Sequence, residues 1–555
     1  MKKSIVLILV VLLLAGCGVR DMPVETASAT EDVPTAVAET PTLQDGICRA
    51  GIHYTDMEYE HYQEERFNNL IAPIYRLAEQ GGSSAEFDKA DTALINEINY
   101  LHTLLTLAKL KHSADPGDTT ATAEYLYAHD LYQRLFNEYW QAMLTLSASQ
   151  HKALIDERYG KDWLAEFVVY EDYEEDESNL FYQENILVSE YDSLMAQEKP
   201  DADAVADVFL QLVELRNTIA KRYGYDCYAD YAYAKIYCRD YDPQDAETIW
   251  HEAKEYFVPL MREYAGDVED AAALLQSDGA FDCNSDAILG AMGSILPNLS
   301  EELGTAFSYF LENGLYNIAF DAHKADEGYT VYLHYYEEPF IFNRPYGDFR
   351  DYSETVHEFG HWCNYYFCGS DLLFSRRDHD LSELQSQGLE LLFVRYYDEI
   401  YGEHADAARS YVLMDKVRGV IEGAMYDEFL RRVYEESDLT TARVNEIFAE
   451  LCEAYGYEPY ESCETEWVSV DHNFENPFYY ISYSVSSLSA LELYNLSLSD
   501  WDTAVDKYMK ICGSDTEHYH ISEVLEDTGF GDFFSADACE ALAASLNAEF
   551  AALLR

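Results

Sequence analysis

The pentapeptide His357-Glu358-Phe359-Gly360-His361 contains the residues of this chain whose types and spacing best fit metal chemistry. On an α-helix, residues four apart share a face and lie roughly 6 Å apart along the axis, so both imidazoles could bind one ion. Glu358 would lie on the neighbouring face, where it could hold and deprotonate a metal-bound water. The pattern predicts a hydrolytic zinc site on a helix, although a pentapeptide of this form also arises by chance.

A catalytic zinc site needs a third protein ligand and an open fourth position. The spacing HExxHxxGxxH is absent, because Asn364 and Phe367 stand where its glycine and third histidine would be. A metzincin is therefore excluded. The remaining candidates for the third ligand lie downstream: Asp371, Asp378, His379, Asp380, Glu383 and Glu390.

Glu383 is favoured among these candidates because residues 381–397 have the pattern of a helix, whose first turn could face the helix of HEFGH. Glu390 lies two turns further along the same stripe. Asp380 and Glu383 also have the form of a capping box, in which Glu383 would only bond the start of its own helix. From spacing alone, both roles of Glu383 remain open.

HEFGH followed by Glu383-Leu-Gln-Ser-Gln-Gly-Leu-Glu390 resembles the thimet oligopeptidase and oligoendopeptidase F family of zinc metallopeptidases, in which E-x-x-S-x-x-x-E follows HExGH. The resemblance implies that Glu383 joins His357 and His361 as ligand of one zinc ion per chain. It also implies a mostly α, two-lobed fold that encloses a deep substrate channel. The expected substrates are short unstructured peptides.

The similarity extends well beyond the predicted metal site. Residues 216–231 are similar to the family's R-x-x-I-A-x-x-x-G-Y-x-x-Y-x-D-Y segment, and Asp351 matches the family's aspartate ahead of HExGH. Residues 472–483 (HNFENPFYYISY) resemble its H-x-F-x-x-P-F-Y-x-x-x-Y element. Recognisable similarity covers residues 212–497, about half of the chain.

The family implies a catalytic role for residues 472–483. Attack on a peptide carbonyl builds an oxyanion that needs donors beyond the metal, and imidazole and phenol groups are suitable. We expect His472 and one tyrosine to serve, with Tyr479 favoured, Tyr483 second and Tyr480 also possible in register. The competing role is packing, since the chain has 48 tyrosines and a single histidine is more often a structural hydrogen-bonding group.

Asp351 and Glu390 are candidates for orienting a ligand imidazole through its far nitrogen. Asp351 could instead be the N-cap of the active-site helix, with Glu354 three residues further on.

Residues 328–343 alternate in polarity and are rich in β-branched and aromatic side chains, with a turn predicted at Glu337-Glu338-Pro339. The pattern predicts a small β-hairpin before the active-site helix. An edge strand of this kind could bind a substrate backbone by β-augmentation. Gly328 and Tyr329 are the predicted substrate contacts, and a hairpin that only packs is the alternative.

The N-terminus has the pattern of an exported lipoprotein. Lys2 and Lys3 precede an apolar run too short to span a bilayer, and the run ends in Leu-Ala-Gly-Cys17, which resembles a bacterial lipobox. Residues 1–16 are therefore predicted to be a signal peptide, with Cys17 lipidated. Residues 17–46 are rich in Thr, Ala, Glu and Pro, which predicts a flexible tether that holds the body at the outer face of the membrane.

The rest of the chain is expected to form an N-terminal helical lobe (residues 47–210) and a catalytic lobe (residues 211–555), because amphipathic helical segments follow one another without a linker. The net charge is -68, from 36 basic and 104 acidic residues. Nucleic acid is therefore a poor partner. We expect a monomer.

These patterns predict a zinc-dependent oligoendopeptidase with Glu358 as general base and proton shuttle. A zinc carboxypeptidase or dipeptidyl carboxypeptidase is the nearest alternative, because HExGH on a helical fold also serves those reactions. A catalytically inactive peptide-binding lipoprotein is a second alternative, but binding alone does not require Glu358. A zinc-scavenging lipoprotein would favour a His-rich loop, and the sequence has none.

Overall fold

The computed structural model describes residues 51–160, 175–195, 197, 199–278, 281–373, 377–457, 463–531, 534 and 536–555. The predicted signal peptide, Cys17 and the tether lie outside these residues. Within this part of the chain, no helix combines the length and apolar character that crossing a membrane would need.

The described chain is mostly helical, with one small sheet, as the sequence predicted. It forms two compact units, each built from two stretches of chain. The first unit holds described residues 51–160 and 281–373, and the second holds the others. The predicted lobe boundary between residues 210 and 211 falls inside a helix of the second unit. The enclosed channel stays a prediction.

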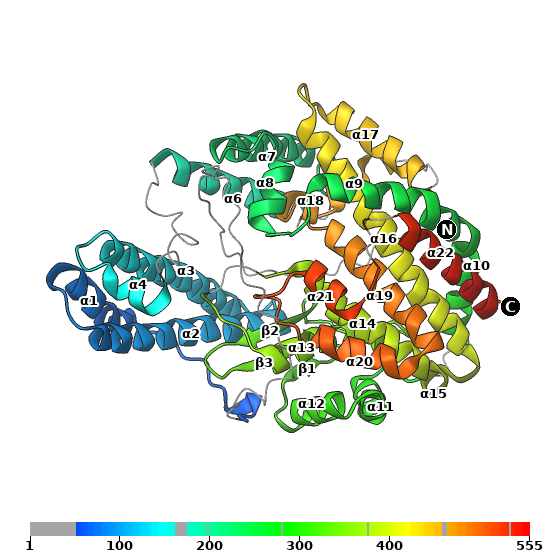
Figure 1. Ribbon diagram of the computed structural model, residues 1–555, viewed down its shortest axis with the longest axis horizontal. Helices are drawn as coiled ribbons and strands as arrows, with labels where there is room; N and C mark the ends of the chain where they lie inside the picture. The colour runs from blue at the N-terminus through cyan, green and yellow to red at the C-terminus, as the bar shows by residue number, and fades with distance from the viewer. Residues whose placement is uncertain are drawn as a thin grey trace, which may run out of the picture. The chain divides into compact units, whose positions relative to one another are not determined.

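The first unit begins with a group of long helices and continues into a second group around the sheet (Figure 1). The first group contains α1 (Glu64–Gln80), α2 (Ser84–Ala114), α3 (Thr119–Ser147) and α4 (Ala153–Tyr159); the second contains α11 (Ser285–Leu299), α12 (Glu301–Glu312) and α13 (Asp351–Cys368). Ser83 and Glu86 start α2 with the reciprocal bonds of a capping box.

The sheet of the first unit has three strands in the order β1 (Tyr316–Ile318), β3 (Glu338–Asn343) and β2 (Gly328–Leu333). β1 is parallel to β3, and β2 is antiparallel to it, with Gly328 opposite Asn343. The predicted hairpin is therefore confirmed. Its turn comes earlier than expected: Glu337 closes it at φ 55°, and Glu338 already pairs with β2. β2 is an edge strand of this sheet.

The described residues of the second unit form helices and connecting segments, and no strand occurs among them. Its N-terminal stretch contains α6 (Glu175–Met195), α7 (Ala202–Arg222), α8 (Tyr228–Tyr231), α9 (Pro243–Glu252) and α10 (Val258–Asp278). Its C-terminal stretch contains α14 (His379–Phe393), α15 (Tyr397–Tyr401), α16 (Ala405–Glu435), α17 (Thr441–Ala454), α18 (His472–Glu475), α19 (Ile481–Ser499), α20 (Trp501–Cys512), α21 (Ile521–Thr528) and α22 (Ala536–Leu553).

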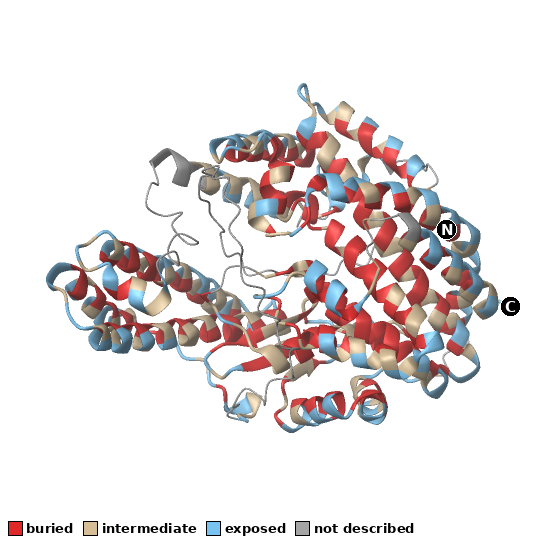
Figure 2. Cartoon of the chain, in the orientation of Figure 1, coloured by how far each residue is buried: buried red, intermediate tan, exposed pale blue. Residues whose placement is uncertain are grey.

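The core of the second unit forms around α19, which packs against both α14 and α16. Every residue of α14 from Asp380 to Phe393 is buried, and Figure 2 shows α14 and α19 buried along most of their lengths. Gln387 of α14 is paired with two serines of α19: its Nε2 donates to Ser486, and Ser487 donates to its Oε1. Such pairing is required where water cannot reach a polar group, and it fixes α14 against α19.

Candidate active site

The predicted site residues fall in both units. The first unit carries Gly328, Tyr329, Asp351, His357, Glu358 and His361; the second carries Glu383, Glu390, His472, Tyr479 and Tyr483.

His357 and His361 lie one turn apart on α13, as the spacing predicted. Their ring centroids are 5.0 Å apart and the rings are inclined at 82°. The helix is held from behind by Phe359 and Trp362, which stack on each other, and Trp362 Nε1 donates to the carbonyl of Pro339 in β3. The apolar back of α13 therefore fixes the orientation of its two imidazoles relative to the sheet.

Glu358 is buried and is held by the edge strand. The hydroxyl oxygen of Thr330 in β2 lies 2.7 Å from Oε2 of Glu358 and 3.0 Å from its carbonyl oxygen. Gly328 lies two residues earlier on the same face of the strand, and a Cβ there would approach Glu358 Oε1 to 4.0 Å. Gly328 thus lies beside the carboxylate predicted to be the general base.

Tyr329 has a different environment from Gly328. Its phenol oxygen donates to Ser113 of α2 at 3.1 Å, its ring stacks on Phe342, and its side chain is buried. Successive residues of a strand point to opposite faces of the sheet. The Tyr329 side chain therefore lies against α2, on the face opposite Thr330 and Glu358.

Asp351 is the first residue of α13, and the N-cap position belongs to Arg350. The buried Asp351 carboxylate accepts backbone N–H groups from Tyr346 (2.8 Å), Gly347 (2.7 Å) and Asp348 (3.0 Å). Burial raises the pKa of Asp351 to about 6, although the hydrogen bonds from these N–H groups by themselves lower the pKa. Its observed role is to fold the turn that leads into the active-site helix.

In the second unit, Glu383 lies in the first part of α14 and is almost fully buried. The N-cap of α14 is Asp378, whose side chain accepts the N–H of Leu381 at 2.7 Å. Asp380 is therefore inside the helix, and the capping-box alternative for Glu383 is wrong. The Glu383 carboxylate is therefore not committed to the start of its own helix.

Tyr479 lies beside Glu383. Its phenol donates to Glu383 Oε1 at 3.1 Å, and burial, followed by the nearby carboxylate, raises the pKa of Tyr479 well above its ordinary value. The phenol therefore stays protonated and is a donor. In this structure that donor is directed at the predicted metal ligand.

One aromatic group lies at α18 and around the start of α19. Its members are His472, Tyr479, Tyr480 and Tyr483. The ring of His472 lies 5.3 Å from that of Tyr479, 5.1 Å from Tyr480 and 6.4 Å from Tyr483. His472 Nδ1 is 3.0 Å from Asp471 Oδ1, which fixes the ring orientation. Tyr483 is half-buried, whereas Tyr479 is buried.

Glu390 lies two turns after Glu383 on α14 and is buried. Its Oε2 is 3.0 Å from Nζ of Lys416 on α16. Burial opposes the charge of Lys416, but the carboxylates of Glu390 and Asp415 raise the pKa of the amine above its ordinary value. This ion pair connects α14 to α16.

The residues predicted to hold a metal fit zinc by their chemistry. His357, His361 and Glu383 each offer one ligand atom, two imidazole nitrogens and one carboxylate oxygen. Zinc accepts this donor set in catalytic sites with one position left for water.

Asp240, Asp378 and His520, all in the second unit, are a further group of potential ligands. However, the Asp378 oxygens accept the backbone N–H groups of Leu381 and Ile521. Asp378 thus joins the starts of α14 and α21, which is a structural role.

Three residues that contact the predicted site residues or the segment around them were not predicted from the sequence. Thr330 contacts Glu358, Arg216 contacts Phe474, and Arg239 contacts Phe478. Thr330 could have been found from strand alternation, since it shares a face with Gly328. Arg216 begins the segment that resembles the family, but its partners are distant in sequence. Arg239 lies beyond that segment, and no motif or periodicity in the sequence pointed to it.

No known family model matches the sequence, and no curated protein matches it. Solved structures do resemble the fold. PZ peptidase A with an inhibitor aligns with a TM-score of 0.73 at 19% identity, covering 90% of this chain and 99% of the other. A protein described as a candidate oligoendopeptidase F gives a TM-score of 0.72 at 21% identity over 90% and 98%. A similar one from Bacillus anthracis gives 0.68 at 19% over the same shares. The chain has the fold of these peptidases.

Proposed function

We propose that the chain is a zinc-dependent oligoendopeptidase, in which His357 and His361 of α13 and Glu383 of α14 bind one zinc ion. The observation that carries the proposal is the arrangement on α13: two imidazoles share one face, and Glu358 between them is held by the edge strand β2. The peptidase fold and the HEFGH and E-x-x-S-x-x-x-E motifs support it.

When bound, zinc would polarise the peptide carbonyl and lower the pKa of a water molecule. Glu358 would accept the proton from that water and deliver it to the leaving amine. Thr330 would keep the carboxylate in place by donating to Oε2. His472 and Tyr483 would donate to the oxyanion that develops on the former carbonyl. Tyr479 could donate to it only after breaking its hydrogen bond to Glu383.

The substrate backbone would pair with the outer edge of β2, the side of this edge strand that does not face β3. Gly328 and Thr330 share the face on which Glu358 lies, so an added strand would run past the general base. Pairing through main-chain groups gives affinity without demanding one sequence, which suits a peptidase for short unstructured peptides.

The first experiment is mass spectrometry of products from a mixed library of short peptides, with and without a zinc chelator. Internal cleavage that is abolished by the chelator and restored by zinc is the expected result. Removal of successive residues or pairs from C-termini would favour a carboxypeptidase. Intact peptides despite stoichiometric zinc would favour a binding lipoprotein.

The variant that tests the mechanism is Glu358→Gln, which preserves shape but cannot accept a proton. We expect this variant to bind one zinc ion per chain. Its rate of hydrolysis should fall by at least about a hundredfold, which is in the range that general-base catalysis usually contributes. Glu301→Gln, an exposed position on α12, is the matched control. Near-normal turnover of Glu358→Gln would refute the mechanism.

We also propose that the protein is exported as a monomer and anchored through a lipid on Cys17. The Lys2-Lys3 charge, the apolar run and the lipobox-like end support this location. Incorporation of labelled fatty acid into the full chain, and its loss in Cys17→Ser, is the expected outcome. Equal labelling of both proteins would exclude the anchor.

A further inference from the structure

The irregular segment between α18 and α19 carries Tyr479 and Tyr480 of the aromatic group. It includes Phe478 at φ 70°, a conformation that costs energy for a bulky side chain and must be held by its surroundings. Two carbonyls of the segment accept side-chain donors, Pro477 from Tyr237 at 3.0 Å and Phe478 from Arg239 at 2.9 Å. The carbonyl of Phe474, in α18 just before the segment, accepts from Arg216 at 2.5 Å. All three donors come from residues 216–239 of the second unit.

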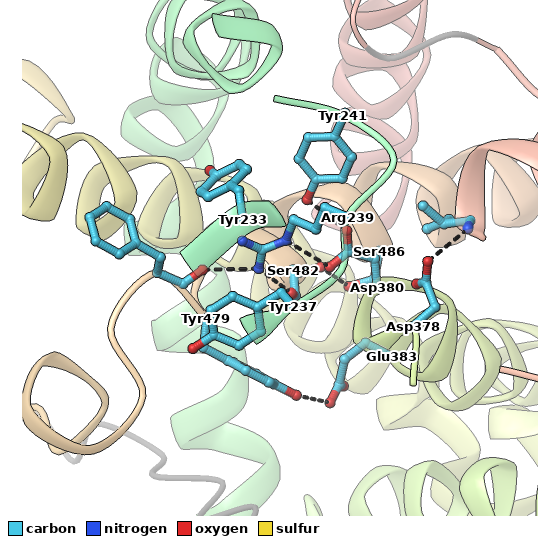
Figure 3. Close-up of polar contacts among 12 residues, drawn as sticks. Tyr233, Tyr237, Arg239, Tyr241, Asp378, Asp380, Glu383, Tyr479, Ser482 and Ser486 are labelled. Atoms are coloured by element: carbon cyan, nitrogen blue, oxygen red, sulfur yellow. Dashed lines mark hydrogen bonds and ion pairs between the residues drawn. The ribbon is translucent and has the colours of Figure 1, made fainter. Parts of the chain in front are cut away.

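Arg239 makes the widest connection of the three (Figure 3). The same Nη2 that donates to Phe478 also donates to Ser482 Oγ at 2.9 Å, and Nε lies 3.8 Å from Asp380 Oδ1. Asp380 is fixed from its other side by Tyr241, whose phenol donates to Oδ2 at 2.6 Å. Arg239 therefore binds the first turns of α14 and α19 at once.

Aromatic rings fix the guanidinium plane. Its central carbon lies 4.5 Å from the ring centroid of Tyr233 and 4.4 Å from that of Tyr237. Tyr233 is itself held by a bond from its phenol to Asp427 at 2.8 Å. Only 3% of the Arg239 side chain is exposed, so charge and plane are both held in a dry environment, where cation–π contacts are strongest.

These contacts form a closed path around the site. Asp380 is three residues before Glu383 on α14, Phe478 directly precedes Tyr479, and Tyr479 donates to Glu383. We propose that Arg239 is a positioning residue that sets the Tyr479–Glu383 hydrogen bond, and through it the orientation of the third metal ligand. The proposal rests on the proposed function for its metal, but its geometry lies entirely within the second unit.

Arginine is required here rather than any cation. A guanidinium presents several N–H groups in one plane, whereas an ammonium is a single point charge on a flexible stem. Lysine at position 239 could keep a charge near Asp380 but could not also reach Phe478 and Ser482 in the same plane. Arg239→Lys therefore loosens the segment without leaving Asp380 buried and unpaired, the outcome that would most endanger folding.

The test is a double-mutant cycle with zinc affinity, measured by competition with a chelator, as its readout. We expect Tyr479→Phe and Arg239→Lys each to weaken zinc binding by about tenfold, the usual range for a residue that orients a ligand. In the Tyr479→Phe background, Arg239→Lys should add less than about twofold, because it acts through the missing phenol. Additive losses, or unchanged zinc affinity in Arg239→Lys, would overturn the proposal.

Matched controls separate positioning from general damage. Arg409→Lys alters another arginine of the second unit that joins carboxylates to a backbone carbonyl, and Tyr457→Phe removes a phenol that donates to Glu422 at 2.7 Å. Both should leave zinc affinity unchanged. If Arg239→Lys does not fold, Ser482→Ala and Tyr237→Phe remove single contacts of the same network and should show the same non-additivity with Tyr479→Phe.

A second readout needs neither metal nor activity. In metal-free protein, amide hydrogen exchange of residues 474–482 should be faster in Arg239→Lys than in the wild type and unchanged in Arg409→Lys. Unaltered exchange would refute the positioning role even if the chain proved to bind no zinc. Failure of the proposed function would appear in the wild type itself, as absent zinc binding and absent cleavage.

Discussion

The hydroxyl of Thr330 on the edge strand lies 2.7 Å from Oε2 of Glu358 on α13, so one side chain joins the strand expected to bind substrate to the expected general base. Thr330→Val keeps the shape and removes the donor. We expect kcat to fall by about tenfold, the order seen when an orienting partner is lost. Thr330→Ser retains the hydroxyl and should stay near the wild type.

The comparison of the two variants separates the hydroxyl from the packing of Thr330. Equal losses of kcat in Thr330→Val and Thr330→Ser would show that Thr330 acts through packing and not through its hydrogen bond to Glu358.

The sequence predicted the parts of the site that depend on local spacing. The one-turn separation of His357 and His361, the helix carrying Glu383, and the hairpin before α13 all follow from periodicity. The third-ligand assignment also used the resemblance, since Asp380 and Glu383 could have been a capping box. The structure assigns the cap to Asp378, a distinction that depends on where the helix begins.

Other features lay beyond sequence reasoning for identifiable reasons. Gly328 and Tyr329 were both expected to contact substrate, yet adjacent strand residues face opposite ways, and alternation alone would have placed the Tyr329 side chain against another element. Arg239 donates to Phe478 and Ser482, each more than 200 positions away, and periodicity carries no information on such pairs. The short strand β1 was missed because three residues give no pattern.

Close packing of α16 against α19 gives a prediction about stability. A Cβ at Gly423 would lie 2.4 Å from Ser484 Oγ and 2.5 Å from the backbone oxygen of Tyr480. Because backbone cannot move as a side chain does, Gly423→Ala should destabilise the protein by about 1–3 kcal/mol despite alanine's better helix propensity.

The control for this packing is Gly266→Ala on α10, where a Cβ meets nothing within 4 Å. At this position only the higher helix propensity of alanine has an effect, so the free energy of unfolding should rise by about 0.5–1 kcal/mol. Chemical denaturation of both variants measures the difference. A neutral Gly423→Ala would mean that α16 and α19 can separate at little cost.

His102 of α2 gives a prediction about acid stability. Its Nδ1 lies 3.1 Å from Nδ1 of His334, so one ring donates and the other accepts. Burial, with a smaller effect of Lys109, lowers the pKa of His102 from 6.5 to about 4. The unfolded chain therefore binds the proton more readily between these values, and stability should fall as pH decreases from about 6.5 to 4.

Replacement by a residue that does not titrate should remove this dependence. His102→Gln is expected to flatten the change in melting temperature between pH 7 and pH 5 relative to the wild type. His129→Gln, another histidine of the first unit, is the control and should keep the wild-type slope. An unchanged slope in His102→Gln would assign the acid sensitivity to other groups.

Asp351 allows its two possible roles to be separated. Its carboxylate accepts three backbone N–H groups from the turn before α13, and asparagine offers one acceptor oxygen while its amide group would face N–H donors. Asp351→Asn should therefore cost about 1–3 kcal/mol of stability, the usual penalty for unsatisfied buried polar groups. Thermal unfolding of the metal-free protein measures this loss. The turn already occupies the carboxylate, so the loss of zinc affinity should be smaller than the roughly tenfold loss expected for a residue that orients a ligand imidazole. A larger loss of affinity with unchanged stability would instead show that Asp351 orients a metal ligand.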